Sequence, residues 1–382
     1  MPFLITDPFP GAVLNHRHGR VVPEGLEIVV QGHYSARNGN TITVNGAPAR
    51  CQDGEFSAAI ILNDGETEIT ARNESCPEKV CSVRVVWDKA SQPRYRLAID
   101  DNIFFLRDLA QRRPGSLFDL FYLRGLRELN RRYGVKVVLN LFFTTPENDF
   151  TLADFPDCYR SEFDASSDWL KLAFHAHAEF PDRPYQDEAG ASRLGADYDR
   201  VATEILRFAG GRAYSPTTVT HWAMVHPSAW GALVARGTRL LSGFFVPCTG
   251  SSYTGGDESL SPDLEGDSYD INCCLDEARS AWLSRHDLLK DFASGLLFSK
   301  VDLVCNNTPV EKIRPLLTEL ANDPRTAEVM DIVTHEQYFW PFYKNHLPDH
   351  FARCEEAIRF CAENGFQPVF FHEGIAGSPL TP

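Results

Sequence analysis

The chain has 382 residues, a length that allows two or three domains of roughly 150 residues each. Hydrophobic residues make up 43% and charged residues 23%, which is the composition of a globular protein and excludes a disordered or fibrous chain. The formal net charge of −15 argues against binding to nucleic acid or to an anionic membrane surface. No stretch approaches ~18 consecutive apolar residues, so no transmembrane helix is expected.

The beginning of the chain and the cysteines both bear on its compartment. The first residues, MPFLITDPFPGAVLNHRHG, have neither the basic region nor the apolar run of a secretory signal. The ten cysteines are scattered and form no CxxC pair, which favours reduced thiols in the core. We therefore expect a cytoplasmic protein, unless a signal peptide has been trimmed.

Residues 1–90 predict a small, all-β, immunoglobulin-like sandwich. Short runs rich in β-branched residues lie near 26–30, 41–44, 56–62, 68–72 and 80–87. They are separated by pairs that favour hairpin turns: Asn38-Gly39, Asn45-Gly46, Asp53-Gly54 and Asp64-Gly65. The order VNG, DGEF and NDGETEI resembles bacterial immunoglobulin-like modules that accompany carbohydrate-active enzymes. Residues 88–93 then form a predicted linker.

From residue 94 to 382 the pattern alternates between strands and helices and predicts a second, catalytic domain. The predicted strands are 95–99, 135–143, 169–174, 218–222, 239–246, 300–305, 329–334 and 368–372. The predicted helices are 117–133, 198–208, 227–236, 310–321 and 351–364. This order is typical of an α/β protein, and we predict a distorted (β/α) barrel of seven or eight strands.

Polar residues follow several of these strands directly. In a parallel barrel the carboxyl ends of the strands meet at one opening, where the chemistry is located. The residues at such ends are Asp100-Asp101, His175, His221, Asp302, His335-Glu336 and His372-Glu373. Adjacent carboxylates repel each other, so one of Asp100 and Asp101 is expected to pair with a cation while the other accepts a proton. The simpler interpretation of the pair is a helix N-cap with a solvated neighbour.

The segment Phe174-His-Ala-His-Ala-Glu179 offers two arrangements. If a helix begins here, His175 and Glu179 share a face at the spacing of metal ligands. If the backbone stays extended, His175 and His177 share a face instead. The sequence does not choose between these two arrangements.

Further residues near the strand ends are candidates for substrate binding. His221-Trp222 joins an imidazole to an aromatic surface on which a sugar could lie. Glu336, Tyr338 and Trp340 follow His335 and could line a groove for a glycan.

The sequence resembles the polysaccharide deacetylase superfamily over about residues 94–375. The resemblance is carried by three strands: the one with Asp100-Asp101, the one that ends in His175, and the late one that ends in Thr334-His335. The resemblance implies the seven-stranded glycosidase/deacetylase barrel, Asp100 as general base, Asp101 as metal ligand and His335 as general acid. In its second motif only His175 matches cleanly, with Glu179 or His177 as a further ligand. Two family features are missing, because Asn102-Ile103 replaces Gly-Pro and 220–222 replaces an arginine-proline motif.

The resemblance implies a metal-dependent hydrolase that removes an N- or O-acyl (acetyl) group from a carbohydrate. The divalent metal is expected to be zinc, with iron, manganese or nickel as alternatives. The competing hypotheses are a metal-independent glycosidase, lyase or epimerase with carboxylates such as Asp100 and Glu336, and a non-catalytic carbohydrate-binding relative. The sequence does not determine the oligomeric state, and the chain could form a homo-oligomer.

Overall fold

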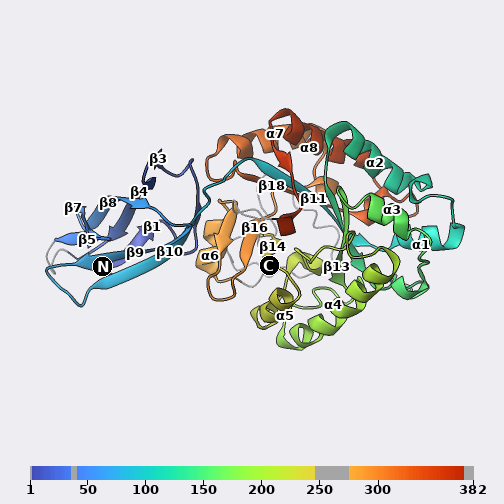
Figure 1. Cartoon of the computed structure of the whole chain (residues 1–382), viewed down its shortest axis with the longest axis horizontal. Helices are drawn as coiled ribbons and strands as arrows, with labels where there is room; N and C mark the ends of the chain where they lie inside the picture. The colour runs from blue at the N-terminus through green and yellow to red at the C-terminus, as the bar shows by residue number, and fades with distance from the viewer. Residues whose placement is uncertain (1, 36–40, 246–274, 374–382) are drawn as a thin grey trace. The chain divides into compact units, whose positions relative to one another are not determined.

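The computed structural model describes residues 2–35, 41–245 and 275–373. Contacts divide the chain into two units, Met1–Ser91 with Leu288–Leu297, and Gln92–Asp287 with Phe298–Ile375 (Figure 1). The predicted domain boundaries at residues 90 and 94 stay predictions. The turn Asn38-Gly39 and the cysteines Cys248, Cys273 and Cys274 lie outside the described residues.

The first unit is built from two five-stranded sheets. Neighbouring strands run antiparallel, except that β2 pairs with β10 in parallel. Buried and exposed side chains alternate along the long strands β4, β8 and β9, so each sheet buries one face, as a period of two requires. One sheet contains β1 (Leu4–Asp7), β3 (Arg20–Val22), β4 (Gly25–His33), β7 (Arg50–Gln52) and β8 (Glu55–Leu62). The other contains β2 (Val13–Leu14), β5 (Ile42–Val44), β6 (Ala47–Pro48), β9 (Glu66–Asn73) and β10 (Val80–Trp87).

The second unit is of the mixed α/β type and centres on a six-stranded sheet of order β13-β12-β11-β18-β17, with β19 also paired to β11. All the pairs that link these strands are parallel, so their carboxyl ends lie at the same edge. Every residue of β11 is buried, as expected for a central strand covered on both faces. The strands are β11 (Arg94–Asn102), β12 (Val137–Phe142), β13 (Leu170–Ala176), β17 (Leu303–Val304), β18 (Val329–His335) and β19 (Gln367–Pro368).

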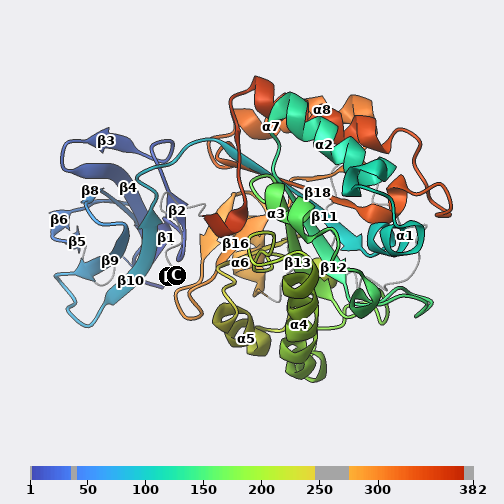
Figure 2. The ribbon, with the colours of Figure 1, turned by 45° about the vertical axis from the view of Figure 1, so that its right-hand side comes forward.

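Helices cover this sheet. Figures 1 and 2 show α2, α7 and α8 together along one side, with α4 and α5 grouped elsewhere. Helix α2 buries Tyr122, Leu123, Leu126 and Leu129 and ends at Gly134, whose φ of 70° suits a glycine C-cap. The α-helices are α1 (Phe104–Arg112), α2 (Phe121–Tyr133), α3 (Arg160–Ala165), α4 (Glu188–Phe208), α5 (Trp230–Ala235), α6 (Glu277–Leu283), α7 (Val310–Asn322) and α8 (His350–Glu363).

Short elements complete the described chain. Strand β14 (Leu240–Gly243) pairs with β16 (Leu297–Lys300), and β15 (Leu288–Lys290) is a further short strand that belongs to the first unit. The 3-10 turns are η2 (Leu117–Asp119), η3 (Leu152–Asp154), η4 (His221–Ala223), η5 (Pro227–Ala229), η6 (Cys305–Asn307), η7 (Glu336–Phe339) and η8 (Phe371–Glu373).

Single main-chain hydrogen bonds continue the main sheet beyond its edge strand β13. Some of these bonds join β13 to residues 213–215, and another joins residue 218 to β14. Residue 301 is then bonded to β14, and residue 302 to β18. The N–H to O distances are Leu172–Ala213 2.8 Å, Ser215–Leu172 2.9 Å, Ser242–Thr218 2.7 Å, Val301–Gly243 2.9 Å and Asp302–Asp331 2.9 Å.

Several elements differ from what the sequence predicted, and two of the differences lie beside the predicted site residues. Residues 218–222 are not a strand, because Trp222 and Ala223 take φ values of 65° and 52° and the chain turns at η4. Helix α1 follows β11 after a single residue and was not predicted. The seven cysteines in the described part of the chain are free, and no helix in that part has the length and apolar character needed to cross a membrane.

Candidate metal centre

The centre begins at the carboxyl end of β11, where the two aspartates are directed to different partners. The register between β11 and β12 shifts between Ile99 and Asn102, and Asp101 has a φ of 61°. Asp100 accepts a hydrogen bond from Asn140 Nδ2 at 2.7 Å. Asp101 instead faces two imidazoles, and both aspartates are buried. The break in register therefore separates the roles that the two adjacent carboxylates can take.

The buried side chains of Asp101, His175 and His221 meet at one place. Asp101 Oδ1 lies 3.1 Å from His175 Nε2 and 3.0 Å from His221 Nδ1. The two imidazole nitrogens are 3.3 Å apart. Among the described residues, these three form the group of histidine, cysteine and carboxylate side chains that could hold a metal ion.

The outer nitrogens of both imidazoles face main-chain carbonyls. His221 Nε2 is 3.0 Å from the carbonyl oxygen of Glu179, and His175 Nδ1 is 3.4 Å from that of Val219. A carbonyl oxygen accepts only, so each neutral imidazole donates its outer N–H and turns a lone pair toward Asp101. This arrangement of an outer acceptor behind each histidine is typical of metal-binding histidines.

The distances within the triangle fit a bound cation. Ligands held about 2.0–2.2 Å from a metal at angles of about 90–110° lie roughly 2.8–3.5 Å from each other. The three separations of 3.0, 3.1 and 3.3 Å fall in this range. Asp101 Oδ1 is buried and has no donor in hydrogen-bonding geometry, so a cation at this place would supply the partner that a buried carboxylate oxygen needs. The residues therefore fit a divalent metal bound by one oxygen and two nitrogens.

The charges in the centre shift the pKa values of its members. Burial raises the pKa of Asp101, but the imidazoles of His221 and His175 outweigh this effect, and the pKa lies well below its ordinary value. Burial lowers the pKa of His175, but the carboxylates of Asp100 and Asp101 raise it above its usual range. Both effects show that the cluster favours positive charge between these side chains.

The metal set that the sequence predicted is only partly brought together. Asp101 and His175 are in the cluster, whereas the third member is His221, which the sequence placed in substrate binding. No helix begins at His175, so Glu179 reaches the centre through its main-chain carbonyl. His177 stacks on Phe143, with ring centroids 5.3 Å apart, and burial lowers its pKa.

His335, the predicted general acid, lies beside Asp100. The two residues are paired in the register between β11 and β18. Asn306 Oδ1 is 2.9 Å from His335 Nδ1, and as an acceptor it requires the proton on that nitrogen. Nε2 is then the nitrogen of the half-buried imidazole that could exchange a proton.

The predicted substrate-binding residues lie in different environments. Trp222 is half-buried beside His221, with Arg183 5.7 Å from its ring. Tyr338 is half-buried, 6.2 Å from the His335 ring. Trp340 is only 2% exposed and packs on Phe121, so little of its surface is open to a sugar.

Glu336 is fully buried and caps helix α1. Its Oε2 accepts hydrogen bonds from the main-chain N–H of Ile103 at 2.6 Å and Phe104 at 2.8 Å. Its Oε1 accepts from Phe105 N–H at 2.6 Å. Because both oxygens are bonded to a helix N-terminus, the carboxylate has the contacts of a structural cap rather than of a substrate ligand.

Three amide side chains that the sequence analysis missed contact the predicted residues. Asn140 bonds to Asp100, Asn306 to His335, and Gln337 Nε2 donates to Asp101 Oδ2 at 3.0 Å. Asn140 lies in β12, and the other two lie in η6 and η7, the turns that follow β17 and β18. The strand-end position of Asn306 and Gln337 was a usable signal, but amides carry no charge and were not selected.

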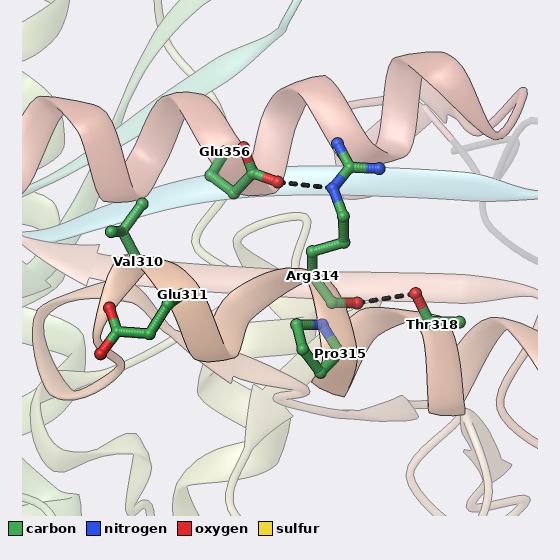
Figure 3. Close-up of a pocket in the computed structure, with 6 residues that line it drawn as sticks. All are labelled: Val310, Glu311, Arg314, Pro315, Thr318 and Glu356. Atoms are coloured by element: carbon green, nitrogen blue, oxygen red, sulfur yellow. Dashed lines mark hydrogen bonds and ion pairs between the residues drawn. The ribbon is translucent and has the colours of Figure 1, made fainter.

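A pocket outside this cluster lies on the surface of α7 and α8 (Figure 3). Arg314 donates to Glu356 at 2.7 Å, and Thr318 donates to the carbonyl of Arg314 at 2.7 Å. The pocket includes none of the predicted site residues. Its lining residues are Val310, Glu311, Arg314, Pro315, Thr318 and Glu356.

The chain was compared with known proteins. No protein-family model and no curated protein matches it. Similar solved structures include the Xyl-CE4 domain of a multidomain xylanase from the hindgut metagenome of Trinervitermes trinervoides, with 11% identity over 73% of this chain and 87% of that one and a TM-score of 0.35. A polysaccharide deacetylase from Bacillus cereus has 11% identity over 74% of this chain and 95% of that one, with a TM-score of 0.33.

The identities and TM-scores are too low to carry an activity from these proteins to this chain. The function is therefore proposed from the geometry of the metal centre.

Proposed function

We propose that the protein is a metal-dependent hydrolase of the polysaccharide deacetylase superfamily that removes an N- or O-acyl group from a carbohydrate. The observation that carries the proposal is the triangle of Asp101 Oδ1, His175 Nε2 and His221 Nδ1, with edges of 3.0–3.3 Å. A base and an acid of the kind that acyl hydrolysis needs, Asp100 and His335, are neighbours on adjacent strands.

In the proposed mechanism, Asp101, His175 and His221 hold the divalent metal, with zinc as the best match to one oxygen and two nitrogen ligands. When bound, the metal supplies Lewis acidity that polarises an acyl oxygen and lowers the pKa of water. Asp100, held by Asn140, accepts the proton of the attacking water. His335, oriented by Asn306, donates a proton from Nε2 to the departing amine or alcohol.

The same proposal includes the finer description of the fold. The main-chain bonds that link β13 to β14 and β18 support a distorted barrel around the strand ends. The two sheets of the first unit support an immunoglobulin-like module. Trp222 and Tyr338, both half-buried beside proposed site residues, remain candidates for contact with a sugar.

Acetate release tests the proposed activity. The substrates are an N-acetylated glucosamine oligosaccharide and an O-acetylated xylo-oligosaccharide, each incubated with zinc-loaded and chelator-treated protein. We expect acetate from at least one substrate with the loaded protein, and none from the Asp101→Asn variant. Asp157→Asn, at an exposed aspartate of the same unit, serves as the matched control and should retain activity. Equal turnover by metal-free protein would contradict the proposal.

A further inference from the structure

Gln337 stands directly behind the carboxylate of Asp101. It belongs to η7, the turn that follows β18, and only 4% of it is exposed. Its Nε2 donates a hydrogen bond to Asp101 Oδ2 at 3.0 Å. The oxygen that faces the imidazoles is the other one, Oδ1. One carboxylate oxygen is thus bonded to an amide, while the second is directed to the centre.

The backbone and the side chain of Asp101 are held by different contacts. Its φ of 61° is in the left-handed region, which residues other than glycine adopt uncommonly, although aspartate does so more often than most. Nearby, Asn102 Nδ2 donates to the carbonyl of Ile99 at 2.6 Å and stabilises the turn itself. That bond does not fix the side chain of Asp101, whose rotation is limited by the partners of its two oxygens.

Glu336 fixes the position from which Gln337 acts. Its carboxylate accepts three main-chain hydrogen bonds from Ile103, Phe104 and Phe105, which follow Asp101 closely along the chain. Trp340 N–H also donates to the carbonyl of Gln337 at 3.0 Å and closes the turn η7. The start of α1 and the turn η7 are therefore tied together, and the amide of Gln337 is held at a set distance from Asp101.

We propose that Gln337 is a positioning residue that holds Asp101 as a one-oxygen ligand of the metal. This inference rests on the proposed function and adds a determinant of metal affinity to it. Gln337 donates a hydrogen bond without adding charge, so it orients the carboxylate and leaves its attraction for a cation intact. Without the donor, the side chain of Asp101 rotates among more conformers, and metal binding then costs the conformational entropy of fixing it.

Zinc affinity of the metal-free protein tests the inference. The full chain is stripped with a chelator and titrated with zinc in competition with a chromophoric chelator. Gln337→Met removes the donor at nearly constant volume and is expected to weaken zinc binding by about 10–100-fold, as for other partners of metal ligands. Gln111→Met, the same substitution at an exposed position of α1, is the matched control and should bind like the wild type.

The outcomes separate the inference from the function on which it rests. Wild-type affinity in Gln337→Met would overturn the role of Gln337 and leave the metal centre standing. An absence of zinc binding by the wild type would overturn both. The thermal unfolding midpoint of the metal-free variants should match that of the wild type. If zinc binding is weaker only in a variant whose midpoint is also lower, Gln337 is a structural residue instead. If Gln337→Met does not fold, Gln337→Asn, which withdraws the donor by one methylene, must show the same loss of affinity.

Discussion

His221 Nε2 lies 3.0 Å from the main-chain carbonyl oxygen of Glu179. This contact means that Glu179 takes part in the centre through its backbone, and that the imidazole of His221 turns Nδ1 toward Asp101. The residue at the fourth position after His175 therefore orients a ligand and does not need its carboxylate to do so.

Substitutions of these two residues should have different consequences for metal binding. His221→Ala removes one of three ligands, so zinc affinity is expected to fall by more than the roughly 10–100-fold that follows loss of an outer partner. Glu179→Gln keeps the carbonyl and should bind zinc nearly as the wild type does. Isothermal titration calorimetry of the metal-free proteins measures both. Loss of binding in Glu179→Gln with retention in His221→Ala would restore the ligand set that the sequence predicted.

The bond from Asn140 to Asp100 should matter for turnover and not for metal binding. Asn140→Leu removes the donor at 2.7 Å from the proposed base, while the three metal ligands keep their contacts. General-base catalysis is typically worth 10²–10⁴-fold, so a misplaced base is expected to lower kcat by about 10-fold or more. Kinetics with acetylated substrate and zinc titration in parallel test this. A variant that loses zinc but keeps kcat when saturated with metal would place Asn140 at the metal instead.

The expectation that polar residues at the carboxyl ends of parallel strands meet (the strand-end rule) was informative, because it depends only on the order of the strands. Asp100, Asp101, His175 and His335 lie at or near the carboxyl ends of three parallel strands of one sheet, and apolar runs identify such strands well. The rule cannot say which neighbouring side chain turns inward once the strand has ended. Glu179 and His177 were both open candidates for this reason, since the choice depended on whether a helix begins at His175.

The remaining features of the centre depend on register and backbone angles that a single sequence does not reveal. His221 is directed to Asp101 at a turn where Trp222 takes a φ of 65°, an angle that is rare for tryptophan. The contacts of Asn140 and Gln337 require that β11 be paired with β12 and β18 in one register. The cap formed by Glu336 requires α1, a short helix that the sequence analysis did not predict.

Asn306 offers a test of the proposed acid. Asn306→Asp places a carboxylate beside His335 Nδ1, which is now 2.9 Å from the amide oxygen. A carboxylate stabilises the protonated imidazole, so His335 should keep its proton to higher pH. The alkaline limb of the pH–rate profile of the zinc-loaded enzyme is therefore expected to move upward by about one unit. A limb that stays in place, or moves to lower pH, would exclude His335 as the group that donates the proton.

Glu336 should make the stability of the metal-free protein depend on pH. Burial raises its pKa to about 7 from an ordinary 4.5, although hydrogen bonds from Ile103, Phe104 and Phe105 oppose the shift. Because the folded state binds this proton more tightly than the unfolded state, the stabilising contribution is full below pH 4.5 and is lost as the pH rises to 7.

Glu336→Gln removes this titration. The free energy of unfolding of the wild type, relative to the variant, should therefore fall by about 3 kcal/mol at most between pH 4.5 and 7. Urea unfolding of both metal-free proteins at several pH values in this range measures the difference. A difference that rises with pH would show that the three N–H groups stabilise the charged form more than burial disfavours it.

The central claim is that Asp101, His175 and His221 hold one divalent ion. Diffraction from zinc-soaked crystals, measured at the zinc absorption edge, locates such an ion directly. The account predicts an anomalous peak about 2.0–2.2 Å from Asp101 Oδ1, His175 Nε2 and His221 Nδ1. A map with no peak between these three atoms, or with the ion bound by His177 or the Glu179 carboxylate, would contradict it.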